Sequence, residues 1–258
     1  MKVAITGASG RLAQYFKEVF PDAIPITRAN NSYETEDLRR AIKDVDYVIH
    51  LAGKIYGKDV YKVNVELAEN LYHALEHQKL FFASSIAVYG RRDLTNADEN
   101  TPPMPNDDYG RGKLKAEEIL REHKPHIIAR IGTLYGEHYP EYIKMIKLWK
   151  LWPFYFSNNH VPFTYARDVA RFALLDVQGT YVLSSPGYPF LEVVNAVREV
   201  FSIKKPPIKL PKLLAHLMLG EKAKPLLLDR TFNPAKALKA GWRITPFKEG
   251  IRCFLTKL

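Results

Sequence analysis

A glycine-rich turn near the start of the chain constrains the fold more than any other feature. A short apolar run at residues 3–6 meets Gly7 and Gly10, and an amphipathic helix is expected from Arg11 onward. Glycine permits a tight strand-to-helix turn and leaves no side chain between the backbone and a ligand. The free N–H groups and the positive end of the following helix favour a pyrophosphate above the turn. Ala13 provides the small residue that lets this helix approach the strand closely.

The first half of the chain continues the same alternation of strand and helix. Short apolar runs alternate with helical patterns, which is typical of a parallel sheet wrapped by helices. The predicted strands lie near 2–6, 23–27, 45–50, 80–84 and 126–130, and the predicted helices near 11–20, 34–43, 59–77 and 109–122. Right-handed crossovers would place a ligand at the carboxyl ends of the strands. We therefore predict an α/β fold with a doubly wound parallel sheet of the Rossmann type.

Beyond residue 131 the pattern breaks into shorter pieces. We predict a Rossmann domain over residues 1–165 and a smaller, mostly helical substrate-binding region over 166–258, interwoven with the sheet. The stretch 86–108 shows no clear periodicity and is rich in Asn, Asp and Pro, and loops of this length commonly border an active site. The leucine- and lysine-rich segment 210–219 is expected to belong to a cap or to the core, with contact to a membrane surface or a partner as the alternative.

Composition narrows the classes of function. The 258 residues carry a net charge of +10, from 38 basic and 28 acidic residues, which favours anionic ligands. The basic residues are scattered and no motif that reads RNA or DNA is present, so nucleic-acid binding is kept only as a rival hypothesis. No apolar run reaches the ~18 residues of a membrane span, and the single cysteine, Cys253, excludes an internal disulfide. We expect a cytoplasmic protein without a membrane partner. No metal site is expected, because the eight histidines show no clustered ligand spacing.

Two side chains that could move a proton follow the aperiodic stretch. Tyr109 and Lys113 are four residues apart at the start of a predicted helix, so they project from the same face. A nearby ammonium stabilises a phenolate and draws the tyrosine pKa down from ~10 toward a value useful for proton transfer. The strand near 80–84 ends in Ser84 and Ser85, and Ser85 is the better candidate to polarise a substrate oxygen because it lies further out of the strand.

These residues belong to a series of short motifs that follow one another along residues 1–175. The series comprises Thr6-Gly7-x-x-Gly10, His50-Leu51-Ala52-Gly53, Asn64, Ser84-Ser85-x-x-Val88-Tyr89-Gly90, Glu99, Pro102, Pro105, Tyr109-x-x-x-Lys113, Arg130, Tyr135-Gly136 and Asp168-Val169-Ala170. A weaker match, Asn233-Pro234-Ala235-Lys236-Ala237 with Gly241-Trp242, lies near the C-terminus. In this order the motifs resemble the extended short-chain dehydrogenases/reductases of the NAD-dependent epimerase/dehydratase family, which includes UDP-galactose 4-epimerase and dTDP-dehydrorhamnose reductase.

The resemblance implies roles for the candidate residues. Ser85 would hold the substrate oxygen, Tyr109 would give or take its proton, and Lys113 would lower the pKa of Tyr109 and bind the nicotinamide ribose. Hydride transfer would belong to the cofactor, while the protein supplies position and electrostatics. The implied cofactor site comprises Gly7, Ser9, Gly10, Arg11, Leu12, Arg28, Leu51, Ala52, Gly53, Asn64, Tyr109, Lys113, Ile131 and Thr133. Pairing of two copies into a homodimer is expected from the resemblance alone.

The end of the second strand indicates which cofactor is used. An acidic residue there would bind the ribose 2′-hydroxyl of NAD, whereas arginine suits a 2′-phosphate. This chain has Arg28 and no carboxylate, and Arg11 in the glycine turn adds positive charge nearby. We therefore predict NADP(H) as the preferred cofactor, with NAD(H) as the alternative.

Departures from the family pattern leave the substrate open. An arginine is expected shortly before Asp168 to bind a nucleotide-sugar diphosphate, but residues 161–165 contain none, and Thr133 replaces an expected asparagine. Candidates for the missing cation are Arg230, Lys222 and Lys224, and Arg167 either binds an anion or forms a surface ion pair. We predict an NAD(P)-dependent oxidoreductase or isomerase that acts on a hydroxyl or carbonyl of a sugar nucleotide or a similar small molecule. The rival is a non-catalytic nucleotide-sensing or nucleic-acid-binding protein on the same fold.

Overall fold

Six parallel strands form the main sheet of the protein. The computed structural model describes residues 1–219 and 227–257. The sheet contains β1 (Val3–Thr6), β2 (Ile24–Ile26), β3 (Tyr47–His50), β4 (Lys79–Ser85), β6 (His126–Ile131) and β11 (Gly179–Leu183), in the order β11-β6-β4-β3-β1-β2. The chain runs from β1 to β2 on one side and returns to β3 on the other, so the strand order reverses at β1. A crevice for a ligand is expected at the carboxyl ends of these strands.

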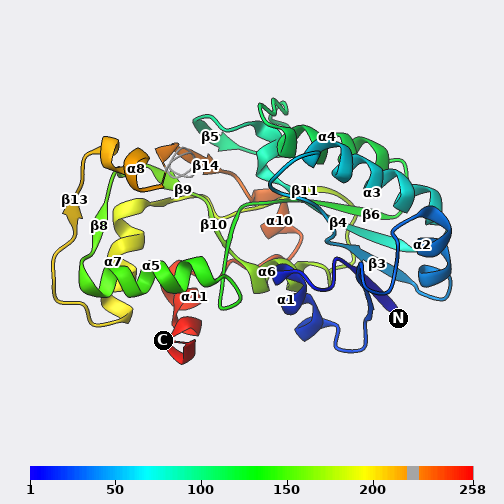
Figure 1. Ribbon diagram of the computed structural model, residues 1–258, viewed down its shortest axis with the longest axis horizontal. Helices are drawn as coiled ribbons and strands as arrows, with labels where there is room; N and C mark the ends of the chain where they lie inside the picture. The colour runs from blue at the N-terminus through cyan, green and yellow to red at the C-terminus, as the bar shows by residue number, and fades with distance from the viewer. Residues whose placement is uncertain (220–226, 258) are drawn as a thin grey trace.

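Helices cover both faces of the sheet. They are α1 (Arg11–Val19), α2 (Thr35–Ile42), α3 (Val60–Ala74), α4 (Asp108–Leu120) and α6 (Ala166–Phe172). Figure 1 shows α2, α3 and α4 on one face, with α1 and α6 on the other. The strands between them are almost continuously apolar and buried, as expected where both faces of a parallel sheet are covered. The predicted doubly wound Rossmann sheet is confirmed.

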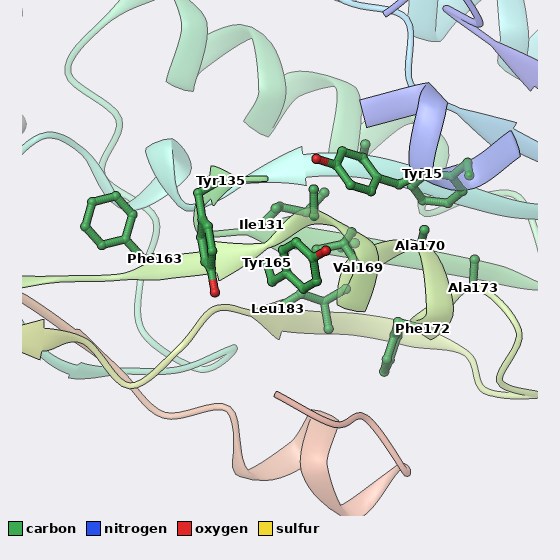
Figure 2. Close-up of a cluster of buried hydrophobic side chains, with 14 of the residues drawn as sticks. Tyr15, Ile131, Tyr135, Phe163, Tyr165, Val169, Ala170, Phe172, Ala173 and Leu183 are labelled. Carbon is green, nitrogen blue, oxygen red and sulfur yellow. The ribbon is translucent and has the colours of Figure 1, made fainter. Parts of the chain in front are cut away.

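Aromatic side chains join the α1 face of the sheet to the rest of the chain. Figure 2 shows Tyr15 of α1 near the rings of Tyr135 and Tyr165, with Phe172 of α6 to one side. The rings of Tyr135 and Tyr165 lie 5.5 Å apart, and the ring of Tyr15 lies 6.3 Å from that of Tyr165 in an edge-on arrangement. Burial of such rings is a large apolar contribution to stability. The region after β6 is therefore packed directly onto the Rossmann half.

The remaining elements are short strands, which pair two by two, and the helices that connect them. They are η1 (Ile86–Tyr89), β5 (Leu94–Ala97), β7 (Thr133–Tyr135), α5 (Pro140–Leu151), β8 (Phe154–Tyr155), β9 (His160–Val161), β10 (Phe163–Tyr165), β12 (Tyr188–Pro189), α7 (Phe190–Val200), β13 (Ile208–Lys209), α8 (Lys212–Leu219), β14 (Arg230–Phe232), α10 (Ala235–Lys239), α11 (Phe247–Gly250) and η3 (Ile251–Lys257). The small sheets join β7 to β10, β9 to β12, β8 to β13 and β5 to β14. Among the described helices, none is both long and apolar enough to cross a bilayer.

Two features of the fold add to the sequence-based prediction. The stretch 86–108 is not aperiodic throughout, because it contains η1 and β5, and β5 pairs with β14 from the C-terminal region. The division at residue 165 stays a prediction; the structure adds that β11, which follows it, forms an edge of the main sheet.

Candidate active site

The glycine turn has the geometry that its sequence predicts. Gly7 lies in the left-handed region at φ +68°, and a Cβ there would come within 2.7 Å of the backbone nitrogen of Ala52. The N–H of Gly10 donates to the oxygen of Gly7 at 2.8 Å, and α1 begins at the next residue without a side-chain cap. Ala13 is fully buried against the strand. The first N–H groups of α1 thus remain available at the end of β1, in the arrangement that binds phosphates in other folds.

Tyr33 closes this turn from the β2 side, which the sequence analysis missed. Its hydroxyl accepts from the N–H of Gly7 at 2.8 Å and donates to the oxygen of Ile26 at 2.9 Å. Burial raises the pKa of Tyr33, opposed by the hydrogen bond from Gly7 and the charge of nearby Arg28. Arg28 itself is exposed. Contact between Arg28 and the adenosine ribose stays a prediction.

Arg11 links the glycine turn to α5 through an ion pair. Its Nη1 lies 2.8 and 2.7 Å from the two carboxylate oxygens of Glu141, and its guanidinium lies 5.7 Å from the ring centroid of Tyr139. Both charged side chains are exposed, so the ion pair itself adds little stability. Ser9 is exposed and Leu12 half-buried in the same turn.

Three of the predicted cofactor residues meet beyond the end of β3. Asn64 is buried, and its amide donates to the oxygens of Lys54 and Val60, at 2.7 Å each. A Cβ on Gly53 would lie 2.8 Å from Oδ1 of Asn64 and 3.3 Å from Nζ of Lys113. Gly53, Asn64 and Lys113 therefore converge from a loop and two helices, next to Ala52 and the glycine turn.

Ser85 of β4 and Tyr109 of α4 are close enough for the Ser85 hydroxyl to lower the pKa of Tyr109. Tyr109 occupies the first turn of α4, which Asp107 caps by accepting from the N–H of Gly110 at 2.7 Å. Burial raises the pKa of Tyr109 to about 12, and the hydrogen bond with Ser85 opposes the rise. The predicted depression of this pKa is thus not present in the structure, because desolvation of the phenolate outweighs its stabilisation.

Lys113 is buried behind Tyr109 on the same helix. Its Nζ donates to the oxygen of Ala83 at 2.8 Å and lies 4.7 Å from the ring centroid of Phe82. Burial lowers the pKa of Lys113 to about 8, while the charge of Glu117 acts in the opposite direction. The ammonium thus faces the strand that carries Ser85, with a pKa close to the physiological range.

A buried ion pair braces α4 against β4 and β6. Arg130 contacts Glu117 through Nη2 at 2.8 Å and through Nε at 3.1 Å to both oxygens, and both side chains are buried. Ser84 donates to the same carboxylate, and Nη1 of Arg130 donates to the hydroxyl of Tyr89 at 3.0 Å. Ser84 is therefore committed to this network, which supports Ser85 as the serine of the candidate site.

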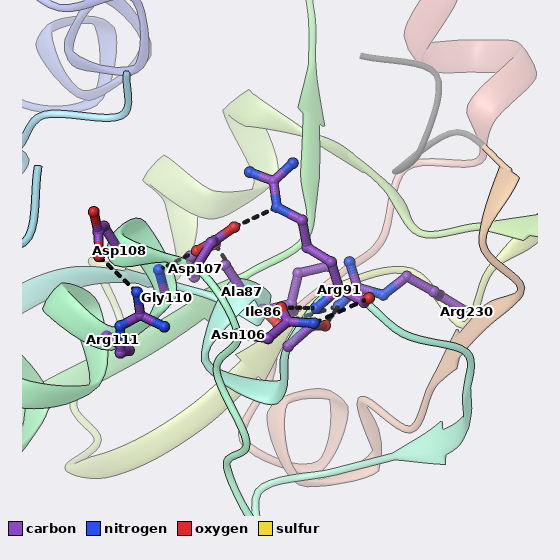
Figure 3. A network of polar contacts seen from close by, with 11 residues as sticks. Ile86, Ala87, Arg91, Asn106, Asp107, Asp108, Gly110, Arg111 and Arg230 are labelled. Atoms are coloured by element: carbon purple, nitrogen blue, oxygen red, sulfur yellow. Dashed lines mark hydrogen bonds and ion pairs between the residues drawn. The ribbon is translucent and has the colours of Figure 1, made fainter. Parts of the chain in front are cut away.

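Arg230 brackets the turn that follows Ser85. Its Nη2 donates to the oxygens of Ile86 at 3.1 Å and Gly90 at 3.4 Å, as Figure 3 shows. The side chain is only 7% exposed, its Nε has no hydrogen-bond partner, and no carboxylate among the described residues pairs with it. Burial lowers the pKa of Arg230 to about 10, with a contribution from Arg91, which itself pairs with Asp107. A buried cation without a counter-charge is costly unless a ligand compensates it.

Other predicted residues have structural partners. Arg167 pairs with Glu137 at 2.6 Å and with Glu18 at 3.0 Å, so it forms ion pairs within the protein, but its side chain is half-buried rather than on the open surface. Glu18, Glu137 and His138 form one cluster of metal-ligand type, but Arg167 already pairs with both carboxylates.

The C-terminal motif is anchored to the Asp168 motif. Asp168 accepts from the N–H and hydroxyl of Thr245 at 2.6 and 2.8 Å, and its backbone oxygen accepts from the indole of Trp242 at 2.9 Å. Ile131 ends β6 and Thr133 begins β7, beside the candidate site. The candidate cations Lys222 and Lys224 lie outside the described residues.

The chain belongs to the NAD dependent epimerase/dehydratase family, whose model matches residues 3–180. It is 28% identical over 219 residues to N-acetyl-alpha-D-glucosaminyl-diphospho-ditrans,octacis-undecaprenol 4-epimerase of Escherichia coli O157:H7, a match that covers 74% of this chain and 66% of that protein. Among solved structures, it is similar to UDP-N-acetylglucosamine 4-epimerase from Bacillus cereus, with a TM-score of 0.79, 24% identity and full coverage of both chains. It is also similar to dTDP-4-dehydrorhamnose reductase from Bacillus anthracis in complex with NADP, with a TM-score of 0.81, 19% identity and coverage of 100% and 99%. At these identities the structural likeness shows the fold.

Proposed function

We propose that this protein is an NAD(P)-dependent epimerase or reductase that acts on a hydroxyl or carbonyl carbon of a diphosphate-linked sugar. The observation that carries the proposal is the convergence of Ser85 at the end of β4 with Tyr109 and Lys113 of α4, where buried Lys113 donates to the backbone of β4 and adjoins Gly53 and Asn64. A binding protein has no physical need for a phenol, a hydroxyl and an ammonium at this point. Membership of the epimerase/dehydratase family also supports an enzymatic function of this kind.

The residues of the crevice fit a dinucleotide. A Cβ on Gly7 would meet backbone, and the free N–H groups of α1 suit a pyrophosphate. Arg28 would bind a ribose 2′-phosphate and Lys113 the nicotinamide ribose, so NADP(H) remains the proposed preference over NAD(H). When bound, the nicotinamide supplies or accepts the hydride. Dissociation constants measured for both cofactors test the preference.

The chain's own groups would manage the substrate proton. Ser85 would hold the substrate oxygen, and Tyr109, which is protonated at neutral pH with a pKa of about 12, would donate a proton to a carbonyl oxygen as it is reduced. In the oxidising direction Tyr109 must act as phenolate, which the ammonium of Lys113 would favour. General acid–base catalysis of this kind contributes about 10²–10⁴-fold to rate.

Arg230 supports a substrate with a diphosphate. It is buried beside the turn that begins at Ser85 and pairs with no carboxylate in the described part of the chain, so an anionic group there would compensate it. The name of the Escherichia coli relative describes a sugar joined through a diphosphate to a lipid, and that of the Bacillus cereus structure describes a nucleotide sugar. Both share the sugar diphosphate that we propose for this chain.

A substrate panel tests the proposal. The purified protein is incubated with UDP-glucose, UDP-N-acetylglucosamine and dTDP-4-dehydrorhamnose, each with either cofactor, and products are separated by chromatography. Conversion of at least one sugar diphosphate is expected, whereas binding of nucleic acid with a steep salt dependence and no conversion would favour the rival. Cofactor retained through gel filtration would indicate an epimerase rather than a reductase. Homodimer formation and a cytoplasmic location remain predictions.

A further inference from the structure

The end of the molecule away from the main sheet carries the helices α5 and α8 (Figure 1), and both expose large apolar side chains. On α5, Leu151 and Trp152 at its C-terminal end are 68% and 53% exposed, next to Leu148. On α8, Leu213 and Leu217 are 70% and 73% exposed and lie four residues apart, on one face. Clustered exposed apolar residues mark interaction surfaces, whereas single ones are common.

A small sheet at this edge of the molecule links the two helices that carry these side chains. The strands β8 and β13, which follow α5 and precede α8, pair in parallel. Nζ of Lys205 donates to the backbone oxygen of Leu151 at 2.8 Å and lies 5.4 Å from the ring centroid of Trp152. Behind the exposed leucines of α8, Ala215 packs on Phe156. The inner side of α8 is thus fixed to β8, and its leucine face points outward.

The same edge carries positive charge without any acidic residue. Residues 142–165 and 200–219 contain seven lysines and no Asp, Glu or Arg. All seven are exposed: Lys144, Lys147, Lys150, Lys204, Lys205, Lys209 and Lys212. On the adjacent helix α7, Glu199 pairs with Lys248, and Glu192 is exposed. We call the exposed residues of 144–152 and 204–217 the basic apolar edge.

We propose that the basic apolar edge docks on the surface of an anionic lipid bilayer. Leucine and tryptophan side chains enter the interfacial layer, while lysines extend along it to anionic headgroups. A protein partner fits the composition less well, because protein interfaces are depleted in lysine and enriched in arginine. The proposal departs from the sequence-based expectation of no membrane partner, and it does not depend on the proposed function.

Vesicle sedimentation tests the proposal. The whole protein is mixed with vesicles of phosphatidylcholine alone or of phosphatidylcholine with phosphatidylglycerol, at low and high salt. Binding is expected only to the anionic vesicles and is expected to weaken with salt. The double variant Leu213→Asp with Leu217→Asp should bind at least tenfold more weakly. The control is Leu174→Asp, since Leu174 is 58% exposed after α6, outside the edge, and this variant should bind like the wild type.

Three results would overturn the proposal. One is an absence of binding to anionic vesicles, and another is an equal loss of binding in the Leu174 control. The third is a wild-type oligomer, seen by light scattering, that the double variant dissociates while vesicle binding stays unchanged, since the edge would then join two copies. Circular dichroism melting of each variant verifies that the fold is retained, and Lys209→Gln with Lys212→Gln provides a second variant that removes charge only.

Discussion

The ammonium of Lys113 donates a 2.8 Å hydrogen bond to the backbone oxygen of Ala83, two residues before Ser85 on β4. Lys113 thereby links α4, the helix that carries Tyr109, to β4, the strand that carries Ser85. The pKa of Lys113, lowered by burial to about 8, makes this link sensitive to pH.

Cofactor affinity is expected to fall as the pH rises through about 8, because the Lys113 ammonium that would bind the ribose is lost there. The free energy of unfolding should instead rise with pH in this range. The pKa of Lys113 in the folded protein lies below the usual lysine pKa of 10.5, so between these values the unfolded chain binds more protons and stability rises with pH. Fluorescence titration of the cofactor from pH 6 to 10 measures the affinity. In Lys113→Met the step near pH 8 should disappear, and its persistence would assign the titration to another group.

Removal of the Glu117 carboxylate is expected to be strongly destabilising. Glu117→Gln leaves Arg130 buried without its counter-charge, which typically costs about 3–5 kcal/mol. Urea unfolding followed by circular dichroism measures the free energy of unfolding. Arg121→Gln is the matched control, because Arg121 is exposed and lies 3.6 Å from the same carboxylate, so its loss should cost about 1 kcal/mol or less. Equal losses in the two variants would contradict the account.

Arg230→Met is expected to separate stability from ligand binding. Without ligand, the variant should be as stable as the wild type or more so, since it removes a buried cation that pairs with no carboxylate among the residues that the structure describes. UDP at about 100 times its dissociation constant for the wild type should raise the free energy of unfolding of the wild type by about 2.7 kcal/mol. The same UDP concentration should raise that of the variant much less. Thermal unfolding with and without UDP provides the measurement. Full stabilisation of the variant by UDP would show that Arg230 does not bind UDP and only stabilises the turn that follows Ser85.

Gly7→Ala should weaken cofactor binding by more than the strain of a positive φ alone would explain. Both Gly7 and Gly57 have positive φ, but a Cβ on Gly7 would meet backbone of Ala52 at 2.7 Å, whereas one on Gly57 would lie 3.8 Å from a lysine side chain. Gly57→Ala therefore controls for backbone strain, at about 1–3 kcal/mol. Gly7→Ala should in addition abolish cofactor binding, measured by calorimetry. Retained affinity in Gly7→Ala would remove the glycine turn from the cofactor site.

The sequence allowed prediction of the elements whose signals are local. The strands β1, β3, β4 and β6 are apolar runs between turns. Gly7 and Gly10 predict the first turn, and the structure leaves no room for a side chain at Gly7. Ser84 and Ser85 could be ranked from their position at the end of the strand.

The missed features depend on contacts between distant segments. Tyr33 lies in a polar loop without periodicity, and only the folded chain brings its hydroxyl to Gly7. The three-residue strand β14 has no detectable pattern of its own, so neither its pairing with β5 nor the burial of Arg230 could be anticipated. The pKa of Tyr109 was predicted in the wrong direction, because sequence spacing reveals a neighbouring charge but not the degree of burial.

The central claim is that Tyr109 transfers the substrate proton. The most direct test is stopped-flow absorbance at the reduced-nicotinamide band, with cofactor-loaded wild-type enzyme and Tyr109→Phe mixed with the sugar diphosphate identified by the panel. The account predicts that the variant binds cofactor normally and forms or consumes reduced nicotinamide at least about 10²-fold more slowly. An unchanged rate in Tyr109→Phe would contradict it.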